Sequence, residues 1–333
     1  MSLPALIAIV LGLSLTVYAI FAGADFGAGI LDLSARKSPE QRIALAHTIG
    51  PLWEANHVWL IFSITITFSA FPTAFATLGV VMLAPLTLAV MAIVVRGVAF
   101  GLRAEPGGQA RSQTLLSAAF GGASVVAPLL FGASAGALAQ VSSSRRVSAT
   151  PLSVPWTGLF ASLVGLLAVA LCAQLAASFM TWRLSRTGQS ESAERFRRRG
   201  LQTGTVVLAL GLLALLAGAW KAPALWHRLS TAALPLLVIG LLAMLASLYA
   251  FARRRYLLAR ASTMLVAGAI VWGWLIAQAP HLVGTRLTIH AAAATHAALT
   301  AFAIAGGVVL LAVLPAFYLP YVLFGRPTPE IAQ

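Results

Sequence analysis

Residues 3–24 read LPALIAIVLGLSLTVYAIFAGA, an apolar stretch without a charged side chain. A bilayer core of roughly 30 Å is crossed by about 20 helical residues, so this stretch is long enough to span a membrane. The rest of the 333-residue chain is similar, because 60% of it is apolar, 9% is charged and the mean hydropathy is +0.92. Soluble domains carry about 25% charged residues and disordered chains are poor in apolar ones, so both classes are excluded.

The fold class predicted from this pattern is an all-α polytopic membrane protein with nine transmembrane helices. The second helix must begin near Pro51, since the apolar run from Val58 alone is too short, and proline is favoured in the first turn of a helix. We expect a single integral membrane domain over 1–333, with two four-helix bundles and a peripheral last helix. The expected spans are 3–24, 51–71, 74–95, 115–139, 156–180, 201–220, 229–251, 263–283 and 293–323.

The basic residues predict the orientation of these spans. The net charge is +14. Under this assignment, 17 of the 22 Lys and Arg residues fall on one side of the membrane, in the loops after the first, third, fifth and seventh spans and in the C-terminal end. Short cytoplasmic loops are enriched in Lys and Arg, so the N-terminus is expected outside and the C-terminus in the cytoplasm. The same distribution explains the basic charge without a nucleic-acid partner, and none is expected.

Two of the eight acidic residues lie where hydropathy predicts helix rather than loop. Glu54 falls in the first turn of the second span, and Asp25 ends the first span, both toward the cytoplasm. Ionisable groups inside a membrane are costly and are therefore candidates for function. The other acids are expected to be solvated in cytoplasmic loops or the tail: Asp32, Glu40, Glu105, Glu191, Glu194 and Glu330.

For both acids, residue chemistry leaves alternatives open. A carboxyl group buried without a counter-charge can carry a proton near neutral pH, as Glu54 would. Alternatively, the Glu54 carboxylate neutralises a nearby arginine or is stabilised by the positive end of its own helix. Asp25 stands between glycines and can organise the end of a helix or begin a proton path. Arg96 and Arg103, at the cytoplasmic end of the third span, can anchor the helix or pair with Asp25 or Glu54.

The histidines argue against a haem or metal site within this chain. His57 lies toward the cytoplasm, whereas the later histidines lie toward the outside, most of a membrane thickness away. Their spacing matches no familiar metal motif, so no metal and no ligated cofactor is expected. The single cysteine, Cys172, cannot form a disulfide within the chain.

Several blocks resemble subunit II of the cytochrome bd-type quinol oxidases. They occur in family order and are densest over residues 20–103. The blocks are GADFG (23–27), IGPLWEANHVWL (49–60), FPTAF (71–75), RGVAFGLR (96–103), QAP (278–280), LTI (287–289) and PAFY (315–318).

The resemblance implies a terminal quinol:dioxygen oxidoreductase of the bacterial or archaeal cytoplasmic (inner) membrane. In that family, subunit I carries haem b and haem d and the quinol site, and subunit II ligates no cofactor. A small accessory subunit can be present. The complex uses quinol electrons and cytoplasmic protons to reduce O2 to water, which builds a proton-motive force without pumping.

Carried over by position, Glu54 and Asp25 are the expected proton-transfer residues. Their motif neighbours are Trp53, Asn56, His57, Trp59, Arg96 and Arg103. Three departures mark a divergent member. His57 replaces the acid that more often follows the asparagine, Gly101 stands where the family often has Glu, and the stretch 173–177 lacks the His-Gly pattern that is common in the fifth span. At Glu54 the more usual acid is Asp, so the carboxyl group is kept on a longer side chain.

A proton-coupled secondary transporter is the rival function. It would use the same two acids, but it predicts inverted repeats and broken helices that meet near the middle of the membrane. Both acids lie near one edge, which favours the oxidase subunit.

Overall fold

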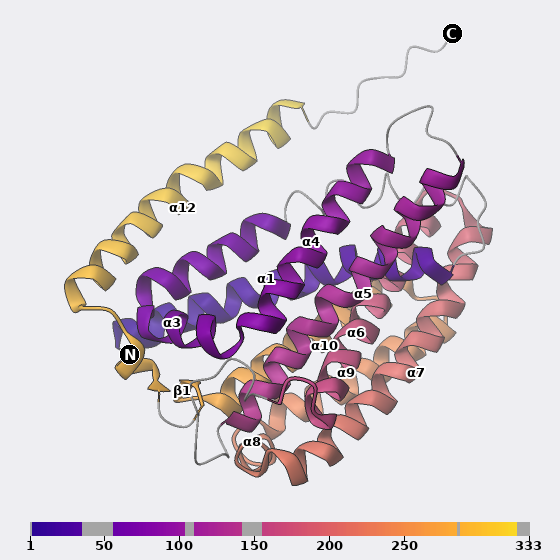
Figure 1. The fold of residues 1–333 in the computed structure, drawn as a ribbon. Coiled ribbons are helices and arrows are strands. Elements are labelled where there is room, and N and C mark those ends of the chain that lie inside the picture. The colour runs from indigo at the N-terminus through magenta and orange to yellow at the C-terminus, as the bar shows by residue number, and fades with distance from the viewer. Residues whose placement is uncertain (1, 35–55, 104–109, 142–154, 285–286, 325–333) are drawn as a thin grey trace.

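The computed structural model describes residues 2–34, 56–103, 110–141, 155–284 and 287–324, and its architecture is helical (Figure 1). Within these ranges, seven helices are long and apolar enough to cross a membrane, or eight if one bent pair counts as a span. The seven are α1 (Leu3–Ser34), α4 (Leu83–Arg103), α5 (Ala110–Val141), α6 (Leu159–Arg186), α7 (Ser190–Lys221), α9 (Leu234–Ala252) and α10 (Tyr256–Gln278). A further apolar helix, α12 (His296–Phe324), follows them.

The bent pair consists of the helix Asn56–Ala70 and the short helix α3 (Pro72–Val81), which meet at 115°. Proline cannot donate a backbone hydrogen bond and is tolerated in the first turn, so the chain turns sharply at Phe71. Ala294 N–H donates to the freed carbonyl of Ala70 over 2.9 Å. The predicted third span, 74–95, is therefore wrong in its bounds, because the long helix is α4 and α3 only leads into it.

The segment after α10 corrects a second boundary. The predicted span 263–283 ends too late, because α10 stops at Gln278 and residues His281–Val283 form strand β1. This strand pairs antiparallel with β2 (Leu287–Thr288), and the one-turn helix α11 (Ile289–Ala292) follows. Gln278 stabilises the hairpin by donating from Nε2 to the carbonyl of Gly284 over 3.2 Å. A second short helix, α8 (Pro223–Leu229), connects α7 to α9.

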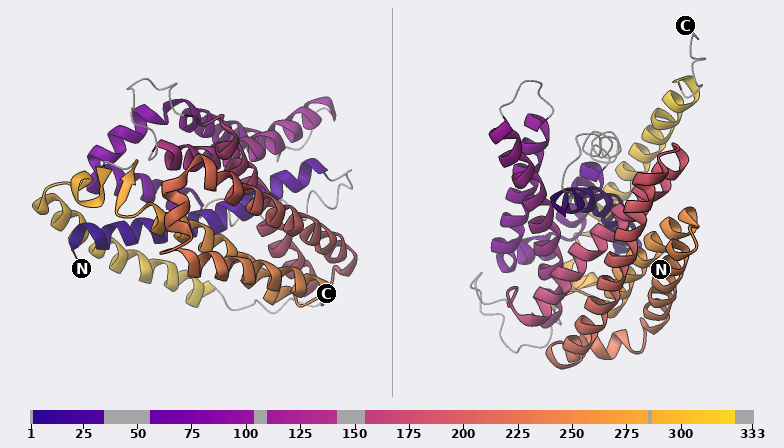
Figure 2. Two further views of the ribbon diagram at one scale, coloured as in Figure 1. Left: turned by 90° about the horizontal axis from the view of Figure 1, so that it is seen from below. Right: turned by 90° about the vertical axis from the view of Figure 1, so that its right-hand side faces the viewer.

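α6 lies at the centre of the helix packing. It contacts α1 and α5 as well as α7 and α10, so the helices form one continuous bundle (Figures 1 and 2). The predicted division into two four-helix bundles is not resolved by these contacts and stays a prediction. α12 runs along the edge of the bundle and touches mainly the beginning of α1.

α1 and α6 approach one another at glycine positions of α1. A Cβ atom built on Gly27 would lie 1.8 Å from the carbonyl oxygen of Cys172, and one on Gly23 would lie 2.6 Å from a Leu175 methyl. Small residues allow membrane helices to pack backbone against backbone, which replaces the hydrophobic drive that lipid does not supply. This close contact fixes the position of Asp25 between the two glycines.

Replacing Gly27 by alanine is expected to lower the stability of the fold by about 1–3 kcal/mol, because the backbone of α6 must move away. Gly101→Ala is the matched control, since a Cβ there meets nothing within 4 Å. Thermal unfolding in mild detergent compares the two variants. Equal melting temperatures would show that the α1–α6 contact is looser than described.

Candidate functional site

The candidate site is centred on a buried ion pair between α1 and α4. Arg96 Nη2 lies 2.6 Å from Asp25 Oδ1, and the two side chains are 2% and 3% exposed. The same nitrogen also donates to the main-chain carbonyl of Asp25 over 3.1 Å. Of the two acids that could pair with Arg96, the structure therefore shows Asp25 as its partner.

Side chains of α1 and α5 also contact the Arg96 guanidinium. Its Nε donates to Ser124 Oγ on α5 over 2.9 Å, and Ser124 in turn donates to the carbonyl of Phe120. The guanidinium carbon lies 5.2 Å from the centre of the Phe26 ring and 4.6 Å from that of Phe120. A cation over aromatic faces is stabilised further when it is removed from water. The orientation of the pair is thus set by three helices.

A second ion pair follows two helical turns later. Arg103 Nη2 lies 3.0 Å from Asp32 Oδ2, and its guanidinium carbon lies 4.9 Å from the Phe120 ring centre. Both partners stand seven residues after those of the first pair, so α1 and α4 run in the same direction. The prediction that Asp32 is solvated in a loop is wrong, because α1 continues to Ser34 and the Asp32 side chain is 7% exposed.

The helix Asn56–Ala70 begins beside the first ion pair. Asn56 is 2% exposed, and both Asn56 and His57 lie close enough to act on the Asp25 carboxylate. Neither Nδ2 nor Oδ1 of Asn56 makes a well-formed hydrogen bond within the described part of the chain. Two of the predicted site residues, Trp53 and Glu54, lie outside the described residues.

Polar side chains continue along α1 away from the ion pairs. Tyr18 precedes Asp25 by seven residues on the same face. Ser14, one turn further, is buried and lies 2.8 Å from Ser63 Oγ on the facing helix. Both serines donate to the main-chain carbonyl of Trp59. Trp59, predicted as a motif residue, thus takes part in this contact through its backbone.

Sequence reasoning missed a second polar cluster in the other half of the bundle. Gln174 on α6 is fully buried, donates to Ser247 Oγ over 3.3 Å and accepts from Thr203. Ser247 also lies 2.9 Å from Thr263 Oγ1. A Gln inside an apolar span is the signal that could have found it, because buried amides need partners. The cluster ties α6, α7, α9 and α10 together.

The ligands for a metal or haem are not gathered in the described ranges. No group of three or more His, Cys, Asp or Glu residues there could hold a metal ion. His227 lies on α8, His281 on β1, His290 on α11 and His296 at the start of α12, whereas His57 lies in the first turn of the helix Asn56–Ala70. The described site offers paired charges and hydrogen-bonding groups, which can hold and orient a proton donor or acceptor.

Comparison with known proteins places the chain among terminal oxidase subunits. The family model for "Cytochrome bd terminal oxidase subunit II" matches residues 3–324. The cytochrome bd ubiquinol oxidase subunit 2 of Bacillus subtilis is 37% identical over 83 residues, or 25% of each chain. A probable cytochrome oxidase subunit 2 of Haemophilus influenzae is 28% identical over 207 residues, which cover 61% of this chain and 53% of that one.

The fold comparison agrees over nearly the whole chain. The solved structure of a bd oxidase from Geobacillus thermodenitrificans matches with a TM-score of 0.79, covering 98% of this chain and 100% of that one at 22% identity. The matched stretches span only a quarter and about half of the two curated relatives. The family model, by contrast, spans almost every residue described. The chain therefore belongs to the cytochrome bd terminal oxidase subunit II family.

Proposed function

We propose that this chain is subunit II of a bd-type quinol oxidase that transfers electrons from quinol to O2. Water is the product, and the protons consumed come from the cytoplasm, so turnover builds a proton-motive force without pumping. The observation that carries the proposal is the match of the family model to residues 3–324. The fold agreement with a bd oxidase structure supports it.

The haem chemistry belongs, in this proposal, to a partner subunit I in the same bacterial or archaeal inner membrane. Haem b and haem d in that partner would supply the redox steps. The described histidines of this chain are dispersed over separate elements, and no group of three or more metal-ligating side chains is gathered among the described residues. Its contribution is to pack against the partner, to exclude water and to deliver protons. A small accessory subunit would complete the complex.

Within this chain, we assign proton delivery to Glu54 and Asp25. Asn56 and His57 follow Glu54 by two and three residues and lie close enough to Asp25 to act on its carboxylate. Arg96 gives that carboxylate a fixed counter-charge and a fixed direction. Asp25 is thus a positioned acceptor on the cytoplasmic half of α1, and Glu54 precedes the first described residue of the facing helix by two positions. The pair forms the entrance of a proton path.

The rival function, a proton-coupled transporter, is less well supported by the geometry. Such proteins bind substrate where broken helices meet near the middle of the membrane. The break at Phe71 instead packs in one cluster with Ile7 and Leu11, near the beginning of α1. The ion pairs lie in the opposite half of α1, so the break and the charges do not form one substrate site.

Purification of the tagged chain in mild detergent, with whatever co-purifies, tests the proposed function. The preparation is expected to consume O2 when a short-chain quinol is added. A tagged preparation that is stable, free of other subunits and inactive with quinol would instead favour the transporter, and substrate-driven proton flux in vesicles would then be measured.

A further inference from the structure

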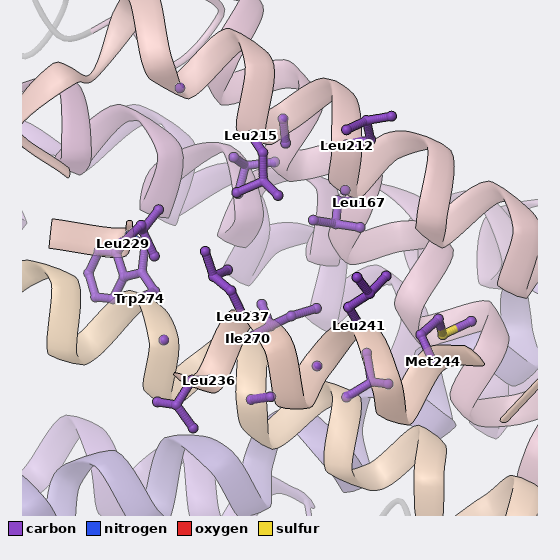
Figure 3. Close-up of a pocket in the computed structure, with 18 of the residues that line it drawn as sticks. Leu167, Leu212, Leu215, Leu229, Leu236, Leu237, Leu241, Met244, Ile270 and Trp274 are labelled. Carbon is purple, nitrogen blue, oxygen red and sulfur yellow. The ribbon is translucent and has the colours of Figure 1, made fainter. Parts of the chain in front are cut away.

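The half of the bundle formed by α6, α7, α9 and α10 separates apolar from charged side chains. A cavity inside it is lined by residues such as Leu212, Leu241 and Ile270, and none of its lining residues is charged (Figure 3). Arginines gather instead where α6 is followed by α7 and where α9 is followed by α10. Arg197 Nη1 donates to the carbonyl of Phe251 over 3.2 Å, so these two turns lie side by side.

The two turns together form one strongly basic surface. Ten arginines stand in residues 183–199 and 253–260, and the same stretches contain only two carboxylates, Glu191 and Glu194. Glu194 contacts three of the arginines, and Glu191 contacts a fourth. The surface therefore carries a large excess of positive charge, which attracts anions from its surroundings.

At one point of this surface, two arginines meet a single tryptophan. The guanidinium carbon of Arg260, on α10, lies 4.3 Å from the centre of the Trp182 ring and 4.6 Å from that of Phe179, both on α6. The guanidinium carbon of Arg186 lies 6.0 Å from the same Trp182 ring. Contact with aromatic rings covers the flat face of a guanidinium and leaves N–H donors at its edge. Neither arginine forms an ion pair or a hydrogen bond within the described ranges.

Apolar side chains adjoin this pair of cations. Phe179 also belongs to a cluster that includes Ile20 on α1 and Met264 on α10, and all three are partly buried. Leu257, which precedes Arg260 by three residues on α10, is 66% exposed. In a membrane, apolar side chains that remain accessible on a helix bundle contact acyl chains. Cations next to such a surface match an amphiphile with an anionic head.

We infer that Arg186, Arg260 and Trp182 form a headgroup site for one anionic phospholipid, such as phosphatidylglycerol. The phosphate accepts hydrogen bonds from both guanidinium groups, as paired arginines favour. Trp182 lies at the level of the glycerol backbone, where tryptophan is enriched in membrane proteins. One acyl chain packs against Phe179 and Met264. The predicted orientation places this end of the bundle at the cytoplasmic leaflet, whose anionic lipids are attracted by clustered basic residues.

Charge and geometry select this occupant. An isoprenoid quinone has an uncharged head and gives the arginines no anion, and a zwitterionic phospholipid brings a cation of its own. The positive-inside rule accounts for the number of arginines on this side but requires no particular arrangement of them. Two arginines that converge on one indole, without a carboxylate, are what distinguish a site from a diffuse basic surface.

The variants Arg186→Gln and Arg260→Gln each remove one cation of the site. Arg186 is exposed, so its replacement is not expected to disturb the fold. Arg253→Gln is the matched control, because Arg253 belongs to the same basic surface but contacts the Tyr249 ring, at 5.6 Å, in place of Trp182. Melting curves verify that each variant is folded.

The chain is purified with whatever subunits co-purify, stripped of lipid with detergent and titrated with phosphatidylglycerol or phosphatidylcholine. Bound lipid is counted by native mass spectrometry. Wild type and Arg253→Gln are expected to bind one phosphatidylglycerol about tenfold more tightly than phosphatidylcholine. Arg186→Gln and Arg260→Gln should each weaken phosphatidylglycerol binding about tenfold, since a hydrogen bond to a charged group contributes about that factor. No turnover is needed, so the result is independent of the proposed oxidase activity.

Vesicles of brominated phosphatidylglycerol give a second readout, because the bromines should quench Trp182 fluorescence, identified by difference from Trp182→Phe. Absence of this quenching would overturn the inference and show that another subunit covers the site. Equal affinity of wild type for the two lipids would also overturn it. An equal loss in Arg253→Gln would replace the site by diffuse attraction, and displacement of the lipid by equimolar glycerol phosphate would make it a site for a soluble anion.

Discussion

The variant Arg96→Gln is expected to destabilise the chain by about 3–5 kcal/mol, the usual cost of removing one partner from a buried ion pair. The Asp25 side chain is only 3% exposed, so without Arg96 its carboxylate is left in a low-dielectric interior. The loss includes the hydrogen bond to Ser124 and the contacts with two aromatic rings. Melting of the purified complex, followed as loss of the assembled species, measures the effect.

A double-mutant cycle separates the ion pair from simple packing. Asp25→Asn alone should also destabilise strongly, because it leaves Arg96 buried without its anion. The double variant Asp25→Asn/Arg96→Gln should be more stable than the sum of the two losses predicts, since neutral partners can hydrogen-bond. Glu191→Gln and Arg195→Gln disrupt an exposed pair and should change little. Strict additivity at Asp25 and Arg96 would contradict the ion pair as described.

The second large effect is expected at Glu54. Glu54→Gln keeps the size of the side chain but cannot bind and release a proton, so quinol-driven O2 consumption should fall by roughly a hundredfold, as when a positioned proton-transfer group is removed. Haem content should stay near that of the unmodified complex. Glu54→Asp should retain more activity, because Asp is the more usual acid at this position in the family that the chain resembles.

The control for Glu54 is a carboxylate of the same type outside the proposed path. Glu191 is exposed on the first turn of α7, and Glu191→Gln should leave O2 consumption unchanged. If Glu54→Gln turned over like the unmodified complex across the pH range of activity, Glu54 would be a structural residue. The proton path would then have to enter through Asp25 or through the partner subunit.

Hydropathy alone predicts the helical membrane fold, because long apolar runs in lipid must form helices. Hydropathy did not predict where α1 ends, because the helix continues through Asp25 and Asp32 to Ser34. Each of these acids is neutralised by an arginine 71 residues later, and a local average of hydropathy does not register such long-range pairs. It also missed the break at Met82, because the apolar composition continues unchanged from α3 into α4.

The candidate site was predicted in its residue types but not in its contacts. Asp25 and Glu54 stood out because charges are rare in apolar segments, and the sequence left both acids as possible partners for Arg96. The structure pairs Arg96 with Asp25, since the hydrogen bonds from Arg96 reach both the carboxylate and the backbone of Asp25. Glu54 lies outside the described residues. Ser124 was not predicted, because a serine on an apolar helix gives no sign of the cation that it accepts from.

The most direct test of the proposed function is the absorption spectrum of the gently purified complex after reduction with dithionite. The account predicts the bands of b-type and d-type haem in the same species that consumes O2 with quinol, with the haem retained by a second large subunit. A pure, folded and haem-free preparation of this chain, obtained under conditions that keep membrane complexes intact, would contradict it.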